Sequence, residues 1–218
     1  KESNKTGVYF RLTEFKGGMA VQGQKTLEAI KDNNCKYRYT CSTENFSKIP
    51  GSPIAYWVSD RMRNVFEKST LLSDIGNPKQ GIATADNNRF LRVWYEVSFK
   101  KFNFNAIDQK SAKESGCKWF PYNKGGAFRK WYGNNDYVVN WENDGQELKK
   151  FKNAVLRNPT YYFRPSITWS KISSGNIAFR YKPIGHIFDV AGTSIFCADK
   201  EKLVYILGLN NSKIILNI

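Results

Sequence analysis

Two stretches of the chain combine basic and aromatic residues and contain no aspartate or glutamate. The first spans residues 118–132 and the second spans residues 157–182. Lysine and arginine neutralise phosphate groups, and aromatic faces support unstacked bases. In a plainer interpretation, the aromatic residues belong to a core and the basic residues between them are exposed. We favour that interpretation for the aromatic residues but not for the basic ones, because the chain has 19 acidic residues and neither stretch contains any.

A polar corner, Thr84–Asn88, lies between a glycine-punctuated loop, Gly76–Gly81, and an apolar run that carries Arg89 and Arg92. Asparagine, glutamine and arginine are the side chains that read base edges, whereas lysine is suited to phosphate. Residue chemistry and expected loop position therefore select two sets of candidate DNA contacts. For phosphate they are Lys79, Lys124, Arg129, Lys130 and Lys171, and for polar readout near bases they are Gln80, Asn87, Asn88, Arg89, Asn134 and Ser173.

Charge supports a polyanionic partner. The 218 residues include 34 basic and 19 acidic ones, for a net charge of +15. Phosphate contacts release condensed counterions, so nucleic acid is the leading candidate, although a merely basic surface remains the alternative. With 12 Tyr, 15 Phe and 6 Trp, the chain can also bury a substantial core.

Catalytic and metal-binding patterns are missing from the sequence. The four cysteines form no C-x-x-C pair, His186 is the only histidine, and neither glycine-rich nucleotide-binding pattern occurs. We expect a structural or solvated role for His186, no catalysis by this chain alone and no cofactor bound to it. No apolar run approaches the roughly 20 residues that span a bilayer, so we expect a cytoplasmic protein with free thiols. The two ends of the chain suggest a piece of a longer protein.

Periodicity predicts an α+β fold in which helices flank a strand-rich middle. Helices are expected at residues 25–33, from Ser52 and Pro53 to Lys68, at 144–151, and at 201–209 with Asp199 as the cap. Residues 108–116 are expected to form a loop or a short exposed helix. Strands are expected at 8–12, between 90 and 104, and at 137–141, 160–163, 167–170, 177–181 and 186–190.

Several motifs in a fixed order also resemble a known family. They are Ile49–Trp57, Gly81–Arg92, Trp119–Gly126 with Phe128–Asn134, Val139–Gly145, Ile167–Ser170 with Ser173, Phe188–Phe196 and Leu209–Lys213. The chain resembles the region that follows the catalytic core in the PglX family, the adenine-specific DNA methyltransferases of BREX phage-defence systems. The resemblance covers nearly the whole chain.

The resemblance implies a fused enzyme in which an S-adenosylmethionine-binding domain with an Asn-Pro-Pro-Tyr motif precedes a target-recognition domain. This chain contains no Asn-Pro-Pro-Tyr. It is therefore similar to the recognition half, with residues 1–48 as the last strand and helix of the methyltransferase domain and 49–218 as the target-recognition domain. Ala85 stands where related specificity domains commonly have glycine, so a positive φ there would strain the alanine.

The expected partners are double-stranded DNA and the methyltransferase domain of the same parent chain, with other BREX subunits or an acidic phage inhibitor as further candidates. In the intact protein the region would position the duplex so that an adenine can flip into the catalytic domain. Two alternatives remain open. One is the specificity domain of a type IIG restriction-modification enzyme, and the other is a protein-docking module that binds an acidic partner.

Overall fold

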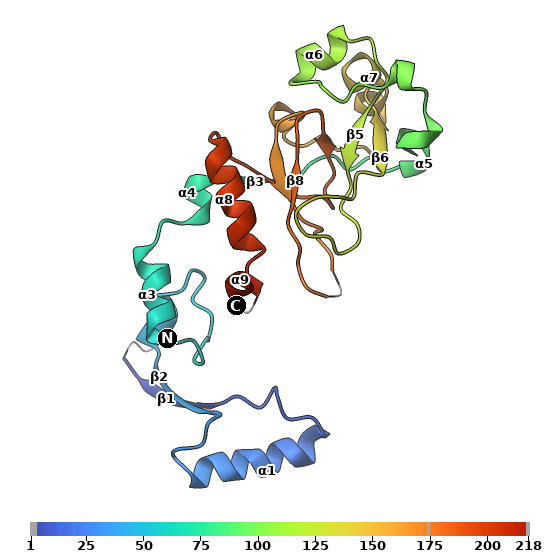
Figure 1. Ribbon diagram of the computed structural model, residues 1–218. Helices are drawn as coiled ribbons and strands as arrows, with labels where there is room; N and C mark the ends of the chain where they lie inside the picture. The colour runs from blue at the N-terminus through green and yellow to red at the C-terminus, as the bar shows by residue number, and fades with distance from the viewer. Residues whose placement is uncertain (1–3, 174, 217–218) are drawn as a thin grey trace. The chain divides into compact units, whose positions relative to one another are not determined.

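The computed structural model describes residues 4–173 and 175–216. The chain forms two compact units, which divide between Leu71 and Leu72 (Figure 1). Residues 49–71 therefore group with the N-terminal residues, whereas the sequence suggested a functional boundary after Lys48. The assignment of residues 1–48 to a methyltransferase domain stays a prediction.

The first unit contains a two-stranded antiparallel sheet. Strand β1, Thr6–Phe10, pairs with β2, Arg38–Ser42, so that Val8 lies opposite Thr40. Helix α1, Gly18–Lys31, connects the two strands along the chain. It begins earlier than predicted, directly at the Gly17-Gly18 pair. The short helix α2, Glu44–Ser47, follows β2.

Helix α3, Asp60–Lys68, corrects the prediction of a helix that starts at Ser52. Its N-cap is Ser59, whose hydroxyl accepts a hydrogen bond from the Met62 amide at 3.3 Å. Ser52 itself is left-handed, with φ 48°. Residues 54–59 stay outside the helix because tertiary contacts hold them: Tyr56 stacks on Tyr9 with ring centroids 4.8 Å apart. These contacts outweigh helix propensity at residues 54–59.

The second unit contains two four-stranded sheets within the described residues. The first has the order β3-β10-β7-β8 and the second has the order β4-β6-β5-β9. All pairs are antiparallel except β5 with β9. The strands are β3 Asn77–Lys79, β4 Leu91–Val93, β5 Trp119–Asn123, β6 Tyr137–Asn140, β7 Ser166–Thr168, β8 Arg180–Lys182, β9 Ile187–Phe188 and β10 Ser194–Phe196.

A helix packs against the first sheet of the second unit. Helix α8, Lys200–Asn210, contacts β7 and β8 (Figure 1). Its Leu203, Ile206 and Leu207 are buried with Ile167 and Phe179. The predicted cap is confirmed, since the Asp199 carboxylate accepts from the amide of Glu201 at 2.8 Å. The other helices of the unit are α4 Leu72–Ile75, α5 Asn87–Phe90, α6 Gln109–Glu114, α7 Glu142–Lys150 and α9 Lys213–Leu216.

A larger core lies under the second sheet. It joins Phe90, Phe120, Val139, Trp141 and Leu148 with other buried residues of both sheets. At Gly81 the backbone of the loop comes very close to the backbone of β9. A Cβ added to Gly81 would lie 1.7 Å from the carbonyl oxygen of Phe188. The loop of residues 76–81 therefore needs a residue without a side chain at its end.

Two strand predictions are wrong in detail. Between residues 90 and 104 only Leu91–Val93 forms a strand, and it is followed by the 3-10 helices η1, Trp94–Glu96, and η2, Phe99–Lys101. Residues 159–161 form a third one, η3 Pro159–Tyr161, in place of a strand. The aromatic residues in these segments pack against neighbouring rings rather than along a strand, so aromatic enrichment misled the prediction. The α+β class itself is confirmed by the mixture of helices and mixed sheets.

No helix in the described part of the chain is long and apolar enough to cross a membrane. Within residues 4–173 and 175–216, no group of three or more His, Cys, Asp or Glu side chains is placed to hold a metal ion.

Candidate nucleic-acid interface

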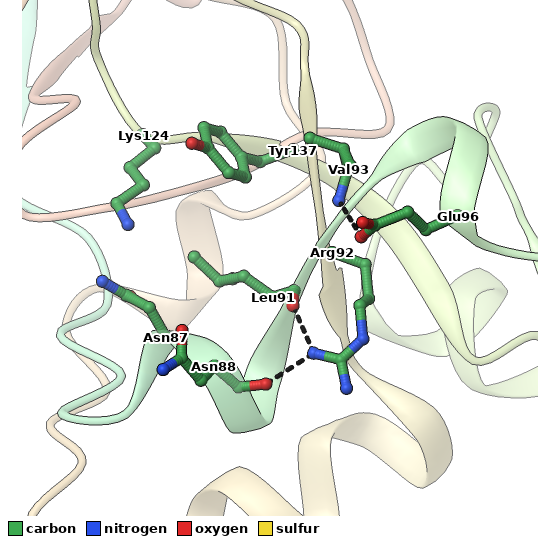
Figure 2. Close-up of a pocket in the computed structure, with 8 residues that line it drawn as sticks. All are labelled: Asn87, Asn88, Leu91, Arg92, Val93, Glu96, Lys124 and Tyr137. Carbon is green, nitrogen blue, oxygen red and sulfur yellow. Dashed lines mark hydrogen bonds between the residues drawn. The ribbon is translucent and has the colours of Figure 1, made fainter.

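A polar pocket at the start of the second sheet brings predicted contacts together. Its volume is about 780 Å³. Three predicted residues, Asn87, Asn88 and Lys124, line it although Lys124 is 36 residues further along the chain than Asn88. Figure 2 shows Lys124 and Asn87 reaching toward one another on one side and Arg92 with Glu96 on the other. The remaining lining residues are Leu91, Val93 and Tyr137.

The corner at residues 84–88 fixes the orientation of Asn87. The buried Thr84 hydroxyl donates to the Asn87 side-chain oxygen at 2.8 Å, so the Asn87 amide nitrogen is the group left to donate. Asp86 caps α5 by accepting from the Arg89 amide at 3.0 Å. Ala85 has φ 59°, the left-handed conformation that glycine would adopt without strain. The corner thus keeps a strained alanine in a left-handed turn.

Arginine 92 completes the other side of the pocket. Its guanidinium donates to the carbonyl oxygens of Asn88 and Leu91 at 2.5 and 2.6 Å. The Glu96 carboxylate accepts from the Val93 amide at 3.1 Å, which closes the first turn of η1 (Figure 2). Across the pocket the Lys124 ammonium lies 5.3 Å from the centre of the Tyr137 ring. An arginine and a lysine therefore face one opening, with Glu96 as the acidic group among the lining residues.

A loop that contains no acid, residues 124–135, follows β5. Its backbone is left-handed at several residues, Trp131 and Asn134 among them. Phe128, Trp131 and Tyr132 are exposed, as is Arg129. The loop therefore presents three exposed rings with Arg129 as an exposed cation, and its Lys124 and Lys130 are half-buried. This is the side-chain mixture that accompanies single strands and phosphate backbones in nucleic-acid interfaces.

Two buried cations hold the loop from inside. Lys182, fully buried on β8, donates to the carbonyl oxygens of Gly133 and Asn134 at 2.9 and 3.0 Å and also to the Asn135 side chain. Arg180, 1% exposed, donates to the carbonyl of Arg129 at 3.3 Å. Backbone carbonyls thus satisfy cations that would be costly to bury alone.

Burial lowers the pKa of Lys182 to about 7, with the charge of Arg180 as a further cause. Burial, followed by the charge of Lys182, also lowers the pKa of His186 to about 4. The imidazole is therefore neutral at pH 7 and offers no cation to a phosphate. Its Nδ1 lies 3.2 Å from the carbonyl oxygen of Ile184.

Ser173 lies at a different pocket, of about 540 Å³, which it shares with Gly126, Ala127 and Phe128 of the loop. The Ser170 hydroxyl donates to the Gly126 carbonyl at 2.8 Å and ties the two segments together. Lys171, two residues before Ser173, is exposed. Predicted contacts from both acid-free stretches therefore gather around one loop.

Other predicted contacts have partners within the fold. Arg89 pairs with Glu147 at 2.8 Å and lies over the Phe151 ring. Lys130 donates to the carbonyl of Asn211 at 3.0 Å. Asn134 is 7% exposed and donates to the carbonyl of Ala127 at 2.9 Å, which gives it a supporting role inside the loop.

Lys79 and Gln80 lie apart from both pockets. The Lys79 ammonium is 5.3 Å from the centre of the Tyr161 ring, and the Gln80 carbonyl accepts from the Asn158 side chain at 2.8 Å. The Gln80 residue is exposed and Lys79 is half-buried. Their roles in DNA binding stay predictions, as do those of the other candidate contacts.

The sequence alone did not select Arg92, Glu96 or Tyr137 as site residues. Arg92 and Tyr137 lie on adjacent strands, since Arg92 is opposite Val138 in the β4–β6 pair. Local sequence carries no signal for that pairing because the two strands are more than 40 residues apart. Only the acid-free run that starts before Lys124 hinted that this edge of the sheet is basic.

Searches against known proteins identify homologues of the chain, whereas no family model matches it. It is 41% identical over 214 residues to "Adenine-specific methyltransferase PglX" of Lacticaseibacillus casei (strain Zhang), a match that covers 94% of the chain and 18% of that protein. It is 40% identical over 195 residues to "Adenine-specific methyltransferase BrxX" of Escherichia coli O9:H4 (strain HS), covering 86% of the chain and 15% of that protein.

The chain spans less than a fifth of the length of these relatives. Identity of this size over nearly the whole chain confirms the resemblance that the ordered motifs indicated. The chain is a homologue of one segment of the adenine-specific methyltransferases PglX and BrxX.

Proposed function

We propose that the chain is the target-recognition part of an adenine-specific DNA methyltransferase of a BREX-type phage-defence system, and that its second unit binds duplex DNA. The observation that carries the proposal is the loop of residues 124–135. It exposes Arg129 and three aromatic rings, and its backbone is held by the buried Lys182 and Arg180. A rigid, acid-free basic loop suits the phosphate contacts that dominate DNA affinity.

In this proposal Lys124 and Arg129 contact phosphates, with Lys171 at the edge of the same surface. Asn87 and Asn88 offer amide groups to base edges from the polar pocket beside Lys124. Arg92 sits in the same pocket and adds positive charge, although two backbone carbonyls already engage its guanidinium. Phosphate contacts set the register of the duplex, and the side chains of the polar pocket read its base edges.

The chemical step belongs to the rest of the parent protein. There S-adenosylmethionine would supply the methyl group, and this chain would orient the duplex so that one adenine leaves the stack. This role agrees with the names of the relatives, which are methyltransferases. The same names favour a methyltransferase parent over a type IIG restriction-modification enzyme.

Salt-dependent binding tests the proposal. Fluorescence anisotropy of a labelled duplex, titrated with the 218-residue chain from about 50 to about 200 mM salt, should show log affinity falling linearly with log salt. Lys124→Ala combined with Arg129→Ala should reduce the slope by about two units, because each phosphate contact contributes about 0.9.

The matched control removes two lysines elsewhere. Lys110 and Lys152 are exposed and line neither pocket described above. Lys110→Ala with Lys152→Ala lowers the net charge by the same amount and should leave the slope nearly unchanged. An equal loss of salt slope in both double variants would indicate that the chain binds DNA only through its general positive charge. If the chain bound the duplex no more tightly than it binds an uncharged polymer, the proposal would be wrong.

A further inference from the structure

An aromatic pocket of about 420 Å³ lies next to the polar pocket. Large side chains with substantial exposure line it: Trp94, Phe99, Phe104, Tyr132, Tyr137 and Ile184. Phe99 alone is 63% exposed. Large apolar side chains left open around a concave surface of this size are typical of a binding site.

Local backbone geometry keeps these rings open. Trp94 and Phe99 lie on the successive 3-10 helices η1 and η2, with ring centroids 6.2 Å apart and planes at 72°. The ring of Phe104 lies 6.3 Å from that of Phe99 at 30°. Behind them the turn at Gly185 approaches so closely that a Cβ there would lie 1.9 Å from the carbonyl oxygen of Phe104. The wall is therefore a packed backbone turn and not a movable side chain.

Tyr137 belongs to both pockets. The Lys124 ammonium lies 5.3 Å from the centre of its ring (Figure 2). A cation over an aromatic face is held by the ring quadrupole. One tyrosine thus separates an aromatic slot from a site where a lysine can meet a phosphate.

Polar groups at the aromatic pocket match the edge of a heterocycle. The Asn135 side-chain oxygen accepts from Lys182, which leaves the amide nitrogen of Asn135 as a donor. Within the described residues the Asn105 carboxamide has no hydrogen-bond partner, and it lines the same pocket. Two amides beside stacked rings offer both donors and acceptors to a ligand that is flat and polar at its edge.

The charges around the pocket favour a nucleotide over an apolar protein segment. Lys100 and Lys101 lie directly after Phe99, both are exposed, and Lys124 lies across Tyr137. Two acids are near: Asp136 adjoins Tyr137 in sequence, and Glu96 is already engaged by the Val93 amide. We propose that the aromatic pocket binds one unstacked nucleobase whose neighbouring phosphate lies at Lys124. This inference rests on the proposed function, because it deepens the way in which the same surface holds DNA.

Comparing the affinity of the chain for two duplexes distinguishes the contribution of the aromatic pocket from that of the rest of the surface. One is fully paired, and the other has the same sequence with a single bulged 2-aminopurine, a fluorescent base that needs no unpairing. The chain should bind the bulged duplex about tenfold more tightly, because the bulged base can stack on the aromatic side chains without first being unpaired. Binding should also quench the 2-aminopurine fluorescence as the base stacks on a ring.

Phe99→Ala should remove the preference for the bulged duplex and the quenching while leaving affinity for the paired duplex within about twofold. Trp94→Ala provides a second variant in the same pocket. Tyr205→Ala is the matched control, because Tyr205 is 69% exposed on α8 and lines neither the aromatic nor the polar pocket. All three side chains are open to solvent, so thermal unfolding should confirm that the variants fold.

Each outcome bears on one of the two proposals. Tighter binding of the bulged duplex that depends on Phe99 and Trp94 supports the pocket assignment. Equal binding of the two duplexes overturns it and leaves the DNA-binding role intact. A preference unaffected by Phe99→Ala and Trp94→Ala also overturns it, and the pocket then fits an apolar segment of a partner protein. Failure to bind either duplex overturns both proposals.

Discussion

The two acid-free stretches look alike in sequence but place their cations differently. In the first, Arg129 is exposed on a loop and Lys124 lines an open pocket. In the second, Arg180 and Lys182 are 1% and 0% exposed and donate to the backbone of the first stretch and its continuation to Asn135. Basic residues of one stretch therefore serve as internal supports for the surface formed by the other.

Strand geometry explains the difference. Successive side chains of a strand point to opposite faces, so Arg180 and Lys182 on β8 point the same way and Tyr181 points the other. The shared face meets the loop of residues 124–135. Loop residues such as Arg129 have no such alternation and can all stay exposed. A count of basic residues thus overstates the number that are available to a phosphate backbone.

The most direct test of this difference between the two stretches is a substitution of Lys182. Lys182→Ala should lower the free energy of unfolding by about 3 kcal/mol, because it leaves two carbonyls and a side-chain amide without their donor. Urea unfolding measures the change. Arg129→Ala, a cation of the first stretch, should stay within about 0.5 kcal/mol of the wild type. Similar losses in the two variants would contradict the assignment of supporting and surface roles.

The pH dependence of stability tests whether Lys182 is charged. Its pKa is about 7 in the fold against a usual value of 10.5, so the unfolded chain binds the additional proton between these values. Stability should therefore rise with pH across this window, by up to about 1.4 kcal/mol per pH unit from this group. Unfolding in urea near pH 7.5 and near pH 9.5 measures the rise.

Lys182→Met provides the reference for that slope, because other groups also titrate. The wild type should gain more stability than Lys182→Met between the two pH values. A constant difference between them would indicate that Lys182 stays protonated, with its three oxygen acceptors outweighing the effect of burial.

Lys130 should have an effect between those of Lys182 and Arg129, and it sharpens the boundary between the two roles. It belongs to the first stretch but is half-buried and donates to the Asn211 carbonyl at 3.0 Å. Lys130→Ala should lower the free energy of unfolding by about 1 kcal/mol. Its effect on the salt slope of DNA binding should be smaller than that of Arg129→Ala. A stability change no larger than that of Arg129→Ala would place Lys130 with the surface residues instead.

Some of the fold could be predicted from local patterns. The α8 helix, its Asp199 cap and its buried Leu203 and Ile206 follow from apolar spacing and a capping residue within a few positions. The helix expected from Ser52 failed because stacking of Tyr56 on Tyr9, 47 residues away, holds its first turns open. Propensity describes neighbours in sequence and does not include such a contact.

Ala85 shows how a question raised by the sequence is decided by the backbone conformation. The sequence indicated that alanine would be strained if the corner needed a positive φ, and φ is 59°. The tertiary structure also decides which of the candidate contacts lie together. Asn87, Asn88 and Lys124 meet at one pocket, whereas Arg89 is drawn to Glu147 on α7, a partner 58 residues away that no local pattern identifies.

The sequence by itself determined the positive charge, the mixed fold and, through its ordered motifs, the kinship with PglX and BrxX. These properties depend on composition and on residues close together along the chain. Only the tertiary structure decided which cations are exposed and which support the loop from within. That choice depends on strand pairing and burial, which bring Lys182 to the carbonyls of Gly133 and Asn134 across nearly 50 residues.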